Sequence, residues 1–253
     1  MILPSLKIAP AEEDRHGHSM TLSLAQLAAA LDSTNLRLDA TATDIEKLCR
    51  EAAEQKFACV MIYPASIPLA ARVLKGTDMK IGTVIGFPSG RFATRAKAAE
   101  IEAAHAAGAQ EVDIVMNYAA LRDGDAATVS TEVTQLTALA HKLGLLIKVI
   151  VETCYLPEPC LLSALKICED AGADFIKTST GFGSAGAKAE HLALWASHRR
   201  SKIQLKAAGG IKTLADAQSM LAAGATRLGT SNAAAIVAEA RGVIPLRTTG
   251  GAY

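Results

Sequence analysis

The chain has 253 residues, half of them hydrophobic, which is the size of one large α/β domain. Its 26 Lys and Arg side chains nearly balance 25 Asp and Glu side chains, so no overall charge attracts nucleic acid or an anionic membrane. No apolar run reaches the roughly 20 residues of a membrane-spanning helix, and five cysteines without zinc or redox spacing favour reduced thiols in a cytoplasmic protein. We therefore expect any partner to be recognised at a local site.

The two ends of the chain differ in composition from the part between them. Residues 1–20 lack a long apolar core and become charged, so they make a poor signal peptide and are expected to form a partly disordered arm. Residues 247–253 contain a glycine pair and end at Tyr253, which is typical of a flexible tail. No linker or low-complexity tract divides residues 21–246, which we expect to form one domain.

Extended and helical patterns alternate along this domain. Short apolar runs predict strands, and amphipathic or alanine-rich runs predict helices. The eight expected strands are Leu31–Ser33, Phe57–Tyr63, Lys80–Phe87, Glu111–Met116, Leu145–Glu152, Asp174–Ser179, Lys202–Ala207 and Thr226–Thr230. The clearest expected helices are Thr21–Leu31, Ile45–Gln55, Ile67–Leu74, Arg95–Ala107 and Leu214–Ala223. Eight strand–helix units in about 230 residues predict an α/β fold of the TIM (β/α)8 barrel type. A doubly wound open sheet is the alternative, although its usual glycine-rich turn after an early strand is missing.

Local signals mark where several helices begin and end. Thr43 followed by Glu46 matches a capping box and predicts the start of the second helix. Three segments, beginning at Ala106, Asp170 and Ala222, share another pattern, in which a helix stops at a glycine and a strand begins within about two residues. This repeated unit is typical of a parallel sheet built from βαβ crossovers.

Three of the expected strands carry a lysine in the middle of an apolar run. Lys148 interrupts LLIKVIVE, Lys177 interrupts DFIKTS and Lys206 interrupts KIQLKAA. A lysine is seldom fully buried without a partner, because removing water from an ammonium group costs several kcal/mol. One such lysine could protect an edge strand, but three in successive strands do not share that explanation. Side-chain alternation turns each lysine away from its apolar neighbours, and in a closed barrel that direction is the interior.

A cluster of interior ammonium groups favours Schiff-base chemistry. Burial and a neighbouring ammonium both lower the pKa of a lysine, and an unprotonated amine attacks a carbonyl to give an imine, which accepts electrons when an adjacent C–C bond breaks. Lys177 and Lys206 lie on adjacent expected strands, so one can lower the pKa of the other. Asp113, on the fourth expected strand, could transfer protons or form an ion pair with Lys148, and the two roles are compatible. Glu152 is the next candidate for proton transfer.

Glycines and small polar residues follow the last three expected strands and predict a phosphate site. Backbone N–H groups at helix N-termini and glycines that admit an anion bind phosphate, and barrels often place such a site after strands seven and eight. The alternative is that turns need glycine in any case. The residues that we expect to bind the phosphorylated substrate here are Thr180, Gly181, Gly209, Gly210, Gly229, Ser231 and Asn232. No histidine-rich spacing in the sequence supports a zinc-dependent aldolase, so no metal ligand is expected.

Four of these motifs occur, in order, in a known family of enzymes. EVDIVMN contains Asp113, LIKVIVET contains Lys148, FIKTSTG contains Lys177 and LKAAGG contains Lys206. Over residues 24–235, including these motifs, the chain resembles the deoxyribose-phosphate aldolases, which are class I aldolases with a TIM barrel. The resemblance implies reversible cleavage of 2-deoxy-D-ribose 5-phosphate to acetaldehyde and D-glyceraldehyde 3-phosphate, without a metal or an organic cofactor.

The resemblance also assigns roles to the lysines and the aspartate. Lys177 would form the Schiff base, Lys206 would tune its pKa, and Asp113 would relay protons with support from Lys148. Two other hypotheses stay open on the residues alone. One is another Schiff-base aldolase of the transaldolase or ketose-phosphate type, and the other is a non-catalytic sugar-phosphate-binding barrel whose lysines are only electrostatic.

Three more residues take a role only from the resemblance. Asp32 and Thr34 would help to hold the hydroxyl groups of the substrate. Tyr253 would fold over the active site and exchange a proton at the enamine carbon, because family members commonly end in a tyrosine. The expected partners are a phosphorylated sugar and aldehydes, and we expect a homo-oligomer, either a dimer or a tetramer.

Overall fold

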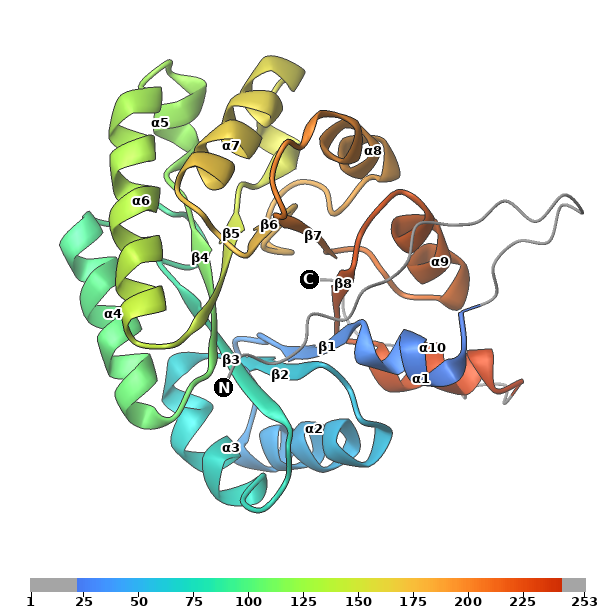
Figure 1. The fold of residues 1–253 in the computed structure, drawn as a ribbon. Coiled ribbons are helices and arrows are strands. Elements are labelled where there is room, and N and C mark those ends of the chain that lie inside the picture. The colour runs from blue at the N-terminus through green and yellow to red at the C-terminus, as the bar shows by residue number, and fades with distance from the viewer. Residues whose placement is uncertain (1–21, 243–253) are drawn as a thin grey trace, which may run out of the picture.

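Eight strands pair side by side in chain order and close into a parallel barrel (Figure 1). The computed structural model describes residues 22–242, so the expected arm (residues 1–20) and tail (residues 247–253) lie outside the described part of the chain. The strands are β1 (Leu31–Asn35), β2 (Cys59–Ile62), β3 (Lys80–Ile85), β4 (Glu111–Val115), β5 (Leu146–Ile150), β6 (Phe175–Lys177), β7 (Gln204–Ala208) and β8 (Arg227–Thr230). β8 pairs with β1, where Leu31 lies opposite Leu228. This pairing closes the sheet, which confirms the TIM barrel and excludes the open sheet.

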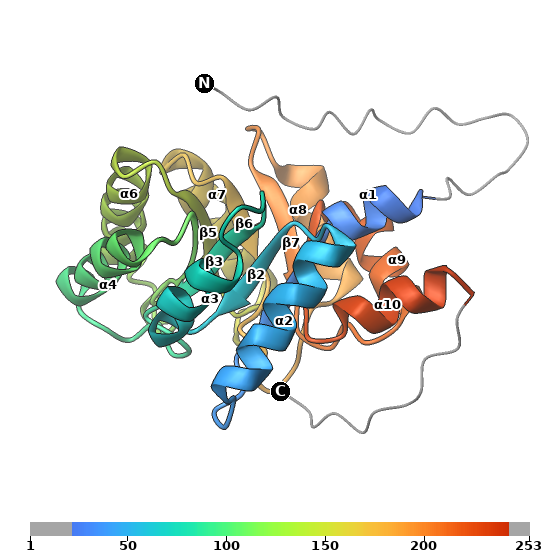
Figure 2. The same ribbon diagram turned by 90° about the horizontal axis from the view of Figure 1, so that it is seen from below.

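Helices surround the barrel and join consecutive strands, as the two ribbon views show (Figures 1 and 2). They are α1 (Leu24–Ala29), α2 (Ala42–Gln55), α3 (Ile67–Val73), α4 (Thr94–Ala107), α5 (Tyr118–Arg122), α6 (Ala126–Lys142), α7 (Glu158–Asp170), α8 (Ala189–His198), α9 (Leu214–Ala222) and α10 (Ala233–Ala240). Short 3-10 turns at Pro64–Ser66 and Thr153–Tyr155 precede α3 and α7. Because all strands are parallel, their C-terminal ends share one face, where such barrels carry their active site. No helix within residues 22–242 is long and apolar enough to cross a membrane.

Local sequence explains where the helices begin and end. α2 begins after Thr41, whose hydroxyl accepts the Asp44 N–H while the Asp44 carboxylate accepts the Thr41 N–H. The expected capping box at Thr43 and Glu46 is therefore wrong by two residues. At the other end of a helix, Gly108 follows α4 with φ of 109°, a left-handed conformation that glycine adopts without strain. This is the helix end that the repeated glycine pattern predicts.

The apolar core lies between the strands and the helices. Ile147 and Val149 flank Lys148 on β5 and belong to the apolar cluster that the barrel shares with its helices, so the lysine points to the other side, into the barrel. Trp195 of α8 is fully buried in the same cluster, and its Nε1 donates a hydrogen bond to the Leu161 carbonyl of α7 at 3.0 Å. Burying an aliphatic side chain such as Ile147 or Val149 contributes about 1.5–3 kcal/mol to stability. The core therefore fixes which side of each strand faces inward.

Five strands, β2 to β6, end one or two residues earlier than the sequence predicts, and in β5 and β6 the structure gives a physical reason. β5 ends at Ile150 and does not reach Glu152, because Glu152 adopts a left-handed backbone conformation with φ of 53°. β6 stops two residues early, at Lys177. Beyond that point the hydroxyl of Thr178 takes over the pairing, since it donates to the Ala208 carbonyl at 3.2 Å and accepts the Ala208 N–H at 3.1 Å. Both departures shape the face that carries the candidate site.

Candidate active site

Three lysine side chains from neighbouring strands are buried inside the barrel. Lys148 on β5, Lys177 on β6 and Lys206 on β7 have side-chain exposures of 0%, 3% and 0%. Lys177 lies opposite Lys206 in the register of the sheet, so their side chains extend to the same side of it. The structure thus brings together the three lysines that side-chain alternation predicts to be interior.

Asp113, on β4, binds all three ammonium groups. Its Oδ2 accepts hydrogen bonds from Lys177 Nζ and Lys206 Nζ, both at 2.7 Å, and its Oδ1 accepts one from Lys148 Nζ at 3.0 Å. Burial by itself raises the pKa of the Asp113 carboxyl, but the three ammonium groups outweigh burial and hold this pKa well below its ordinary value. Asp113 is therefore a carboxylate at neutral pH, and its predicted ion pair with Lys148 is formed.

Lys177 has the surroundings of a nucleophilic amine. Burial lowers its pKa, the Asp113 carboxylate opposes that change, and the Lys206 ammonium adds to it, so that the pKa falls to about 8. About a tenth of the amine is then unprotonated at pH 7. Burial also acts to lower the pKa of Lys148, but there the carboxylates of Asp113 and Glu111 outweigh it and raise the pKa above its ordinary value. Lys177 is thus suited to attack a carbonyl, whereas Lys148 stays an ammonium.

Asp32, on β1, faces the same interior and is bound to cations. Its Oδ2 accepts a hydrogen bond from Lys206 Nζ, and its Oδ1 accepts one from Arg227 Nε at 2.8 Å. These cations outweigh burial and hold the pKa of Asp32 below its ordinary value. Thr34 follows two residues later, nearer the C-terminal end of β1, and its Oγ1 donates to the Asp32 carbonyl at 3.0 Å. The expected contact of Asp32 and Thr34 with substrate hydroxyl groups stays a prediction.

Hydrogen bonds hold the loop after β6 against Glu152. The Glu152 carboxylate accepts the Thr180 N–H at 3.3 Å and also the Thr180 hydroxyl, while the Phe182 N–H donates to Thr180 Oγ1 at 3.0 Å. Gly181, between them, has φ of 88°, which favours glycine. Burial raises the pKa of Glu152, although the hydrogen bonds from Thr180 oppose the change. A hollow of about 110 Å³ opens beside Glu152 and Thr180. The structure thus places Glu152 beside the loop that contains two predicted substrate-binding residues.

The loops after β6, β7 and β8 meet on the C-terminal face of the barrel. Gly209 and Gly210 have φ of 85° and 78°, and a Cβ placed on Gly186 would lie 2.2 Å from the Gly209 carbonyl oxygen, so the first two loops touch through their backbones. After β8, the Asn232 N–H donates to Thr230 Oγ1 at 2.9 Å. α9 and α10 begin on this face. The first N–H groups of α9 already bind side chains, since Leu214 donates to Glu239 and Thr213 to Asp216. No side chain caps α10, so its N-terminus offers N–H groups to an anion. The predicted phosphate residues Gly209, Gly210, Gly229, Ser231 and Asn232 all lie on these loops or strand ends.

Two charged interior residues are absent from the residues predicted for the site. Glu111 precedes Asp113 by two positions on β4, and Arg227 precedes Gly229 by two positions on β8, so both lie one layer nearer the N-terminal end of the barrel. Glu111 Oε2 accepts hydrogen bonds from Arg227 Nη2 at 2.9 Å and from Lys148 Nζ at 2.5 Å. The sequence carries a signal for Glu111, which shares the parity of Asp113, whereas no residue predicted to be interior shares a strand with Arg227.

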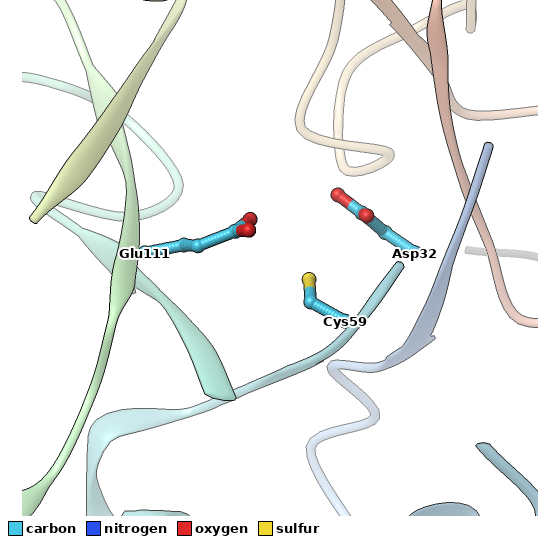
Figure 3. Close-up of side chains that lie close together, drawn as sticks. All are labelled: Asp32, Cys59 and Glu111. Atoms are coloured by element: carbon cyan, nitrogen blue, oxygen red, sulfur yellow. The ribbon is translucent and has the colours of Figure 1, made fainter. Parts of the chain in front are cut away.

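Asp32, Cys59 and Glu111 form a cluster of residue types that can bind metals. Figure 3 shows the two carboxylates extending toward each other with the Cys59 thiol between them, and their ligand atoms lie within 4.8 Å of one another. However, Arg227 donates to both carboxylates and Lys148 donates to Glu111. Burial raises the pKa of Cys59 well above its ordinary value, whereas a thiolate is the form that binds metals. The two carboxylates therefore serve as counter-ions to buried cations.

Comparison with known proteins decides the family. Residues 26–249 match the family described as DeoC/LacD family aldolase. The chain belongs to this aldolase family. It is 44% identical over 212 residues to the deoxyribose-phosphate aldolase of Aciduliprofundum boonei, covering 84% of this chain and 96% of that one. It is 43% identical over 218 residues to the deoxyribose-phosphate aldolase of Carboxydothermus hydrogenoformans, covering 85% and 96%. The tetrameric deoxyribose phosphate aldolase of Aeropyrum pernix has the same fold, with a TM-score of 0.82 and 31% identity over 88% of this chain and 94% of that one.

The family assignment confirms the resemblance that the four sequence motifs carry. It also confirms that the chain is an aldolase, and hence a carbon–carbon lyase. Asp113, Lys148, Lys177 and Lys206 all lie within the matched stretch, and in the structure each of the three lysines binds Asp113. Tyr253 lies outside both the matched stretch and the described residues, so its role stays a prediction.

Proposed function

We propose that this aldolase reversibly cleaves 2-deoxy-D-ribose 5-phosphate to acetaldehyde and D-glyceraldehyde 3-phosphate through a Schiff base on Lys177. The observation that carries the proposal is the buried Lys177 amine, which lies against Asp113 and beside Lys206 and whose pKa of about 8 leaves a nucleophilic fraction at neutral pH. Relatives that are 43% and 44% identical are named deoxyribose-phosphate aldolases, which supports the choice of substrate.

The cleavage reaction follows from the chemistry of an imine. The Lys177 amine attacks C1 of the open-chain sugar, and loss of water gives the imine. The C3 hydroxyl then gives up its proton, the C2–C3 bond breaks, and its electron pair moves toward the imine to form an enamine while glyceraldehyde 3-phosphate leaves. Protonation of the enamine at C2 and hydrolysis of the resulting imine release acetaldehyde and restore the free amine.

The residues around Lys177 divide the remaining tasks. Asp113 would accept and return protons, because it is a buried carboxylate within hydrogen-bond distance of the amine. Lys148, an ammonium bound to the other oxygen of Asp113, would hold that carboxylate in place. Lys206 binds the same oxygen as Lys177, and its positive charge disfavours protonation of the Lys177 amine to an ammonium.

The substrate would span the C-terminal face of the barrel. Asp32 and Thr34 would hold the sugar hydroxyl groups from β1. The phosphate would bind the N–H groups of the loops after β7 and β8, with Thr180 and Gly181 completing the site from the β6 side. Tyr253 would exchange the proton at the enamine carbon. The position of Thr34 nearer the strand end and the contact between the loops after β6 and β7 support this orientation.

We further infer the setting in which the enzyme works. It would act in the cytoplasm as a homo-oligomer, either a dimer or a tetramer, on small phosphorylated sugars and aldehydes, without a cofactor and without a nucleic-acid or membrane partner. The near balance of charges supports the absence of the last two. The relative from Aeropyrum pernix is described as tetrameric, which supports an oligomer. Sedimentation equilibrium of the purified chain would measure the subunit number.

Substrate assays separate the proposal from its alternatives. The purified enzyme should release acetaldehyde from deoxyribose 5-phosphate and, in reverse, should condense acetaldehyde with glyceraldehyde 3-phosphate. Turnover with dihydroxyacetone phosphate as donor, and none with acetaldehyde, would instead identify an aldolase of the ketose-phosphate type. A protein that binds deoxyribose 5-phosphate but releases no product, and that borohydride does not modify, would be a non-catalytic binding barrel.

A further inference from the structure

The buried charges of the barrel form a closed ring of ion pairs. In order round the ring the members are Arg227, Asp32, Lys206, Asp113, Lys148 and Glu111, each hydrogen-bonded to the next and the last to the first. Three cations alternate with three anions, so the ring itself has no net charge. Five members have side chains that are at most 7% exposed, and Arg227 is 13% exposed. Little water is therefore available to compensate any imbalance.

Lys177 is attached to this ring as a seventh group. Its Nζ donates to Asp113 Oδ2, the oxygen that also accepts Lys206 Nζ. With Lys177 as an ammonium, the seven groups together carry one positive charge, and with Lys177 as a free amine they carry none. Because an uncompensated buried charge is costly, the balanced ring favours the free amine.

We propose that Arg227 and Glu111 are positioning residues for Lys177, and that by completing a charge-balanced ring they keep its amine free for attack. Arg227 acts through Asp32, which also binds Lys206, and Glu111 acts through Lys148. This role deepens the Schiff-base function proposed for Lys177 and rests on it. It gives a catalytic purpose to the two interior charges that the mechanism itself does not use.

The charged groups that face Lys177 come from several elements. They are Asp113 from β4, Lys148 from β5, Lys206 from β7 and Glu152 from the loop after β5. The pKa of Lys177 is lowered by burial and raised by Asp113, and the ammonium groups of Lys206 and Lys148 lower it further. The pKa of Lys177 is lowered overall, as expected if a ring without net charge favours the free amine. Glu152 is the same in every variant below, so it cannot produce a difference between them.

The proposal predicts opposite effects for the two residues. Arg227→Gln removes a cation and leaves the ring with one negative charge, so Lys177 holds its proton more tightly and its pKa rises. Glu111→Gln removes an anion and leaves one positive charge, so the pKa of Lys177 falls. Each shift is expected to be on the order of one pH unit, which is the effect of a unit charge about 10 Å away at an effective dielectric constant of about 20. The double variant restores the balance and should return the pKa close to that of the wild type.

The test is the pH dependence of imine formation in the full-length enzyme. Acetaldehyde and borohydride are added over a pH range that spans the pKa of Lys177, and the rate of adduct formation on Lys177 is measured by mass spectrometry. Arg227→Lys and Glu111→Asp keep the charges and serve as matched controls, expected to leave the profile near its wild-type position. Far-UV circular dichroism establishes that each variant is folded. If Arg227→Gln does not fold, Glu111→Gln and the double variant supply the deciding comparison, because glutamine keeps the size of the glutamate.

The outcomes separate this inference from the function on which it rests. A rise in pKa for Arg227→Gln, a fall for Glu111→Gln and a return in the double variant would support the ring. Shifts in the same direction, no shift, or a double variant that departs further than either single variant would overturn it, because packing rather than charge would then be responsible. The absence of any adduct on Lys177 in the wild-type enzyme would overturn the proposed function and this inference with it.

Discussion

Replacing Lys206 by methionine tests how the pKa of Lys177 is set. Both ammonium nitrogens lie 2.7 Å from Asp113 Oδ2, so they are at most twice that distance apart. Two unit charges about 5 Å apart interact by about 3 kcal/mol at an effective dielectric constant of about 20, which corresponds to about two pKa units. Without the Lys206 charge, the pKa of Lys177 should therefore rise by about this amount from its value of about 8. A raised lysine pKa means less free amine at neutral pH, by a factor of about 100.

The assay is kcat/KM for cleavage of deoxyribose 5-phosphate as a function of pH, because this parameter reports the pKa values of the free enzyme. The Lys206→Met variant should lose activity about 100-fold at neutral pH and regain much of it as the pH rises toward the new pKa. Lys202→Met, which removes an exposed lysine just before β7, is the matched control and should leave the profile unchanged. A deficit of constant size at every pH would refute the reasoning and would assign Lys206 another task, such as contact with the phosphate.

Four further predictions concern separate parts of the molecule. Asp113→Asn should lower kcat by roughly 10²–10⁴-fold with a smaller effect on substrate binding, since the amide keeps the shape but cannot exchange protons; wild-type turnover would assign proton transfer elsewhere. Ser231→Glu should raise KM for deoxyribose 5-phosphate far more than KM for unphosphorylated deoxyribose, because the carboxylate repels the phosphate, and equal losses would place the phosphate at another site. Tyr253→Phe should slow deuterium uptake from heavy water into acetaldehyde while imine trapping on Lys177 continues, and unchanged uptake would remove Tyr253 from the mechanism. Lys97→Met should lower the free energy of unfolding by about 3–5 kcal/mol, measured by urea denaturation, because it leaves the buried Glu132 carboxylate without the ammonium that binds it at 2.8 Å; a loss below about 1 kcal/mol would show that water compensates Glu132.

The sequence predicts the interior lysines well because their positions depend on local alternation. Ile147 and Val149 pack outward on either side of Lys148, and this pattern alone determines which way the lysine points. The same argument places Asp113 inside. The closed barrel then determines which of these side chains are neighbours. Lys177 and Lys206 lie together because their strands are adjacent in the sheet.

The start of α2 and the ion pair between Arg227 and Glu111 were not predicted, because the local sequence pattern does not determine them. Thr41 and Thr43 are each followed three residues later by an acidic side chain, so two overlapping capping boxes are possible, and only the course of the chain before α2 selects Thr41. The pairing of Arg227 with Glu111 joins residues 116 positions apart. It requires the register of every strand between them, which no single segment encodes.

The most direct test of the account is to identify the residue that forms the imine. The enzyme is reduced with borohydride in the presence of acetaldehyde, digested and analysed by mass spectrometry. The account predicts an ethyl group on Lys177 alone, and none in a Lys177→Arg variant that retains its circular dichroism spectrum. An adduct on Lys148 or Lys206, or an active enzyme in which Lys177 stays unmodified, would contradict it.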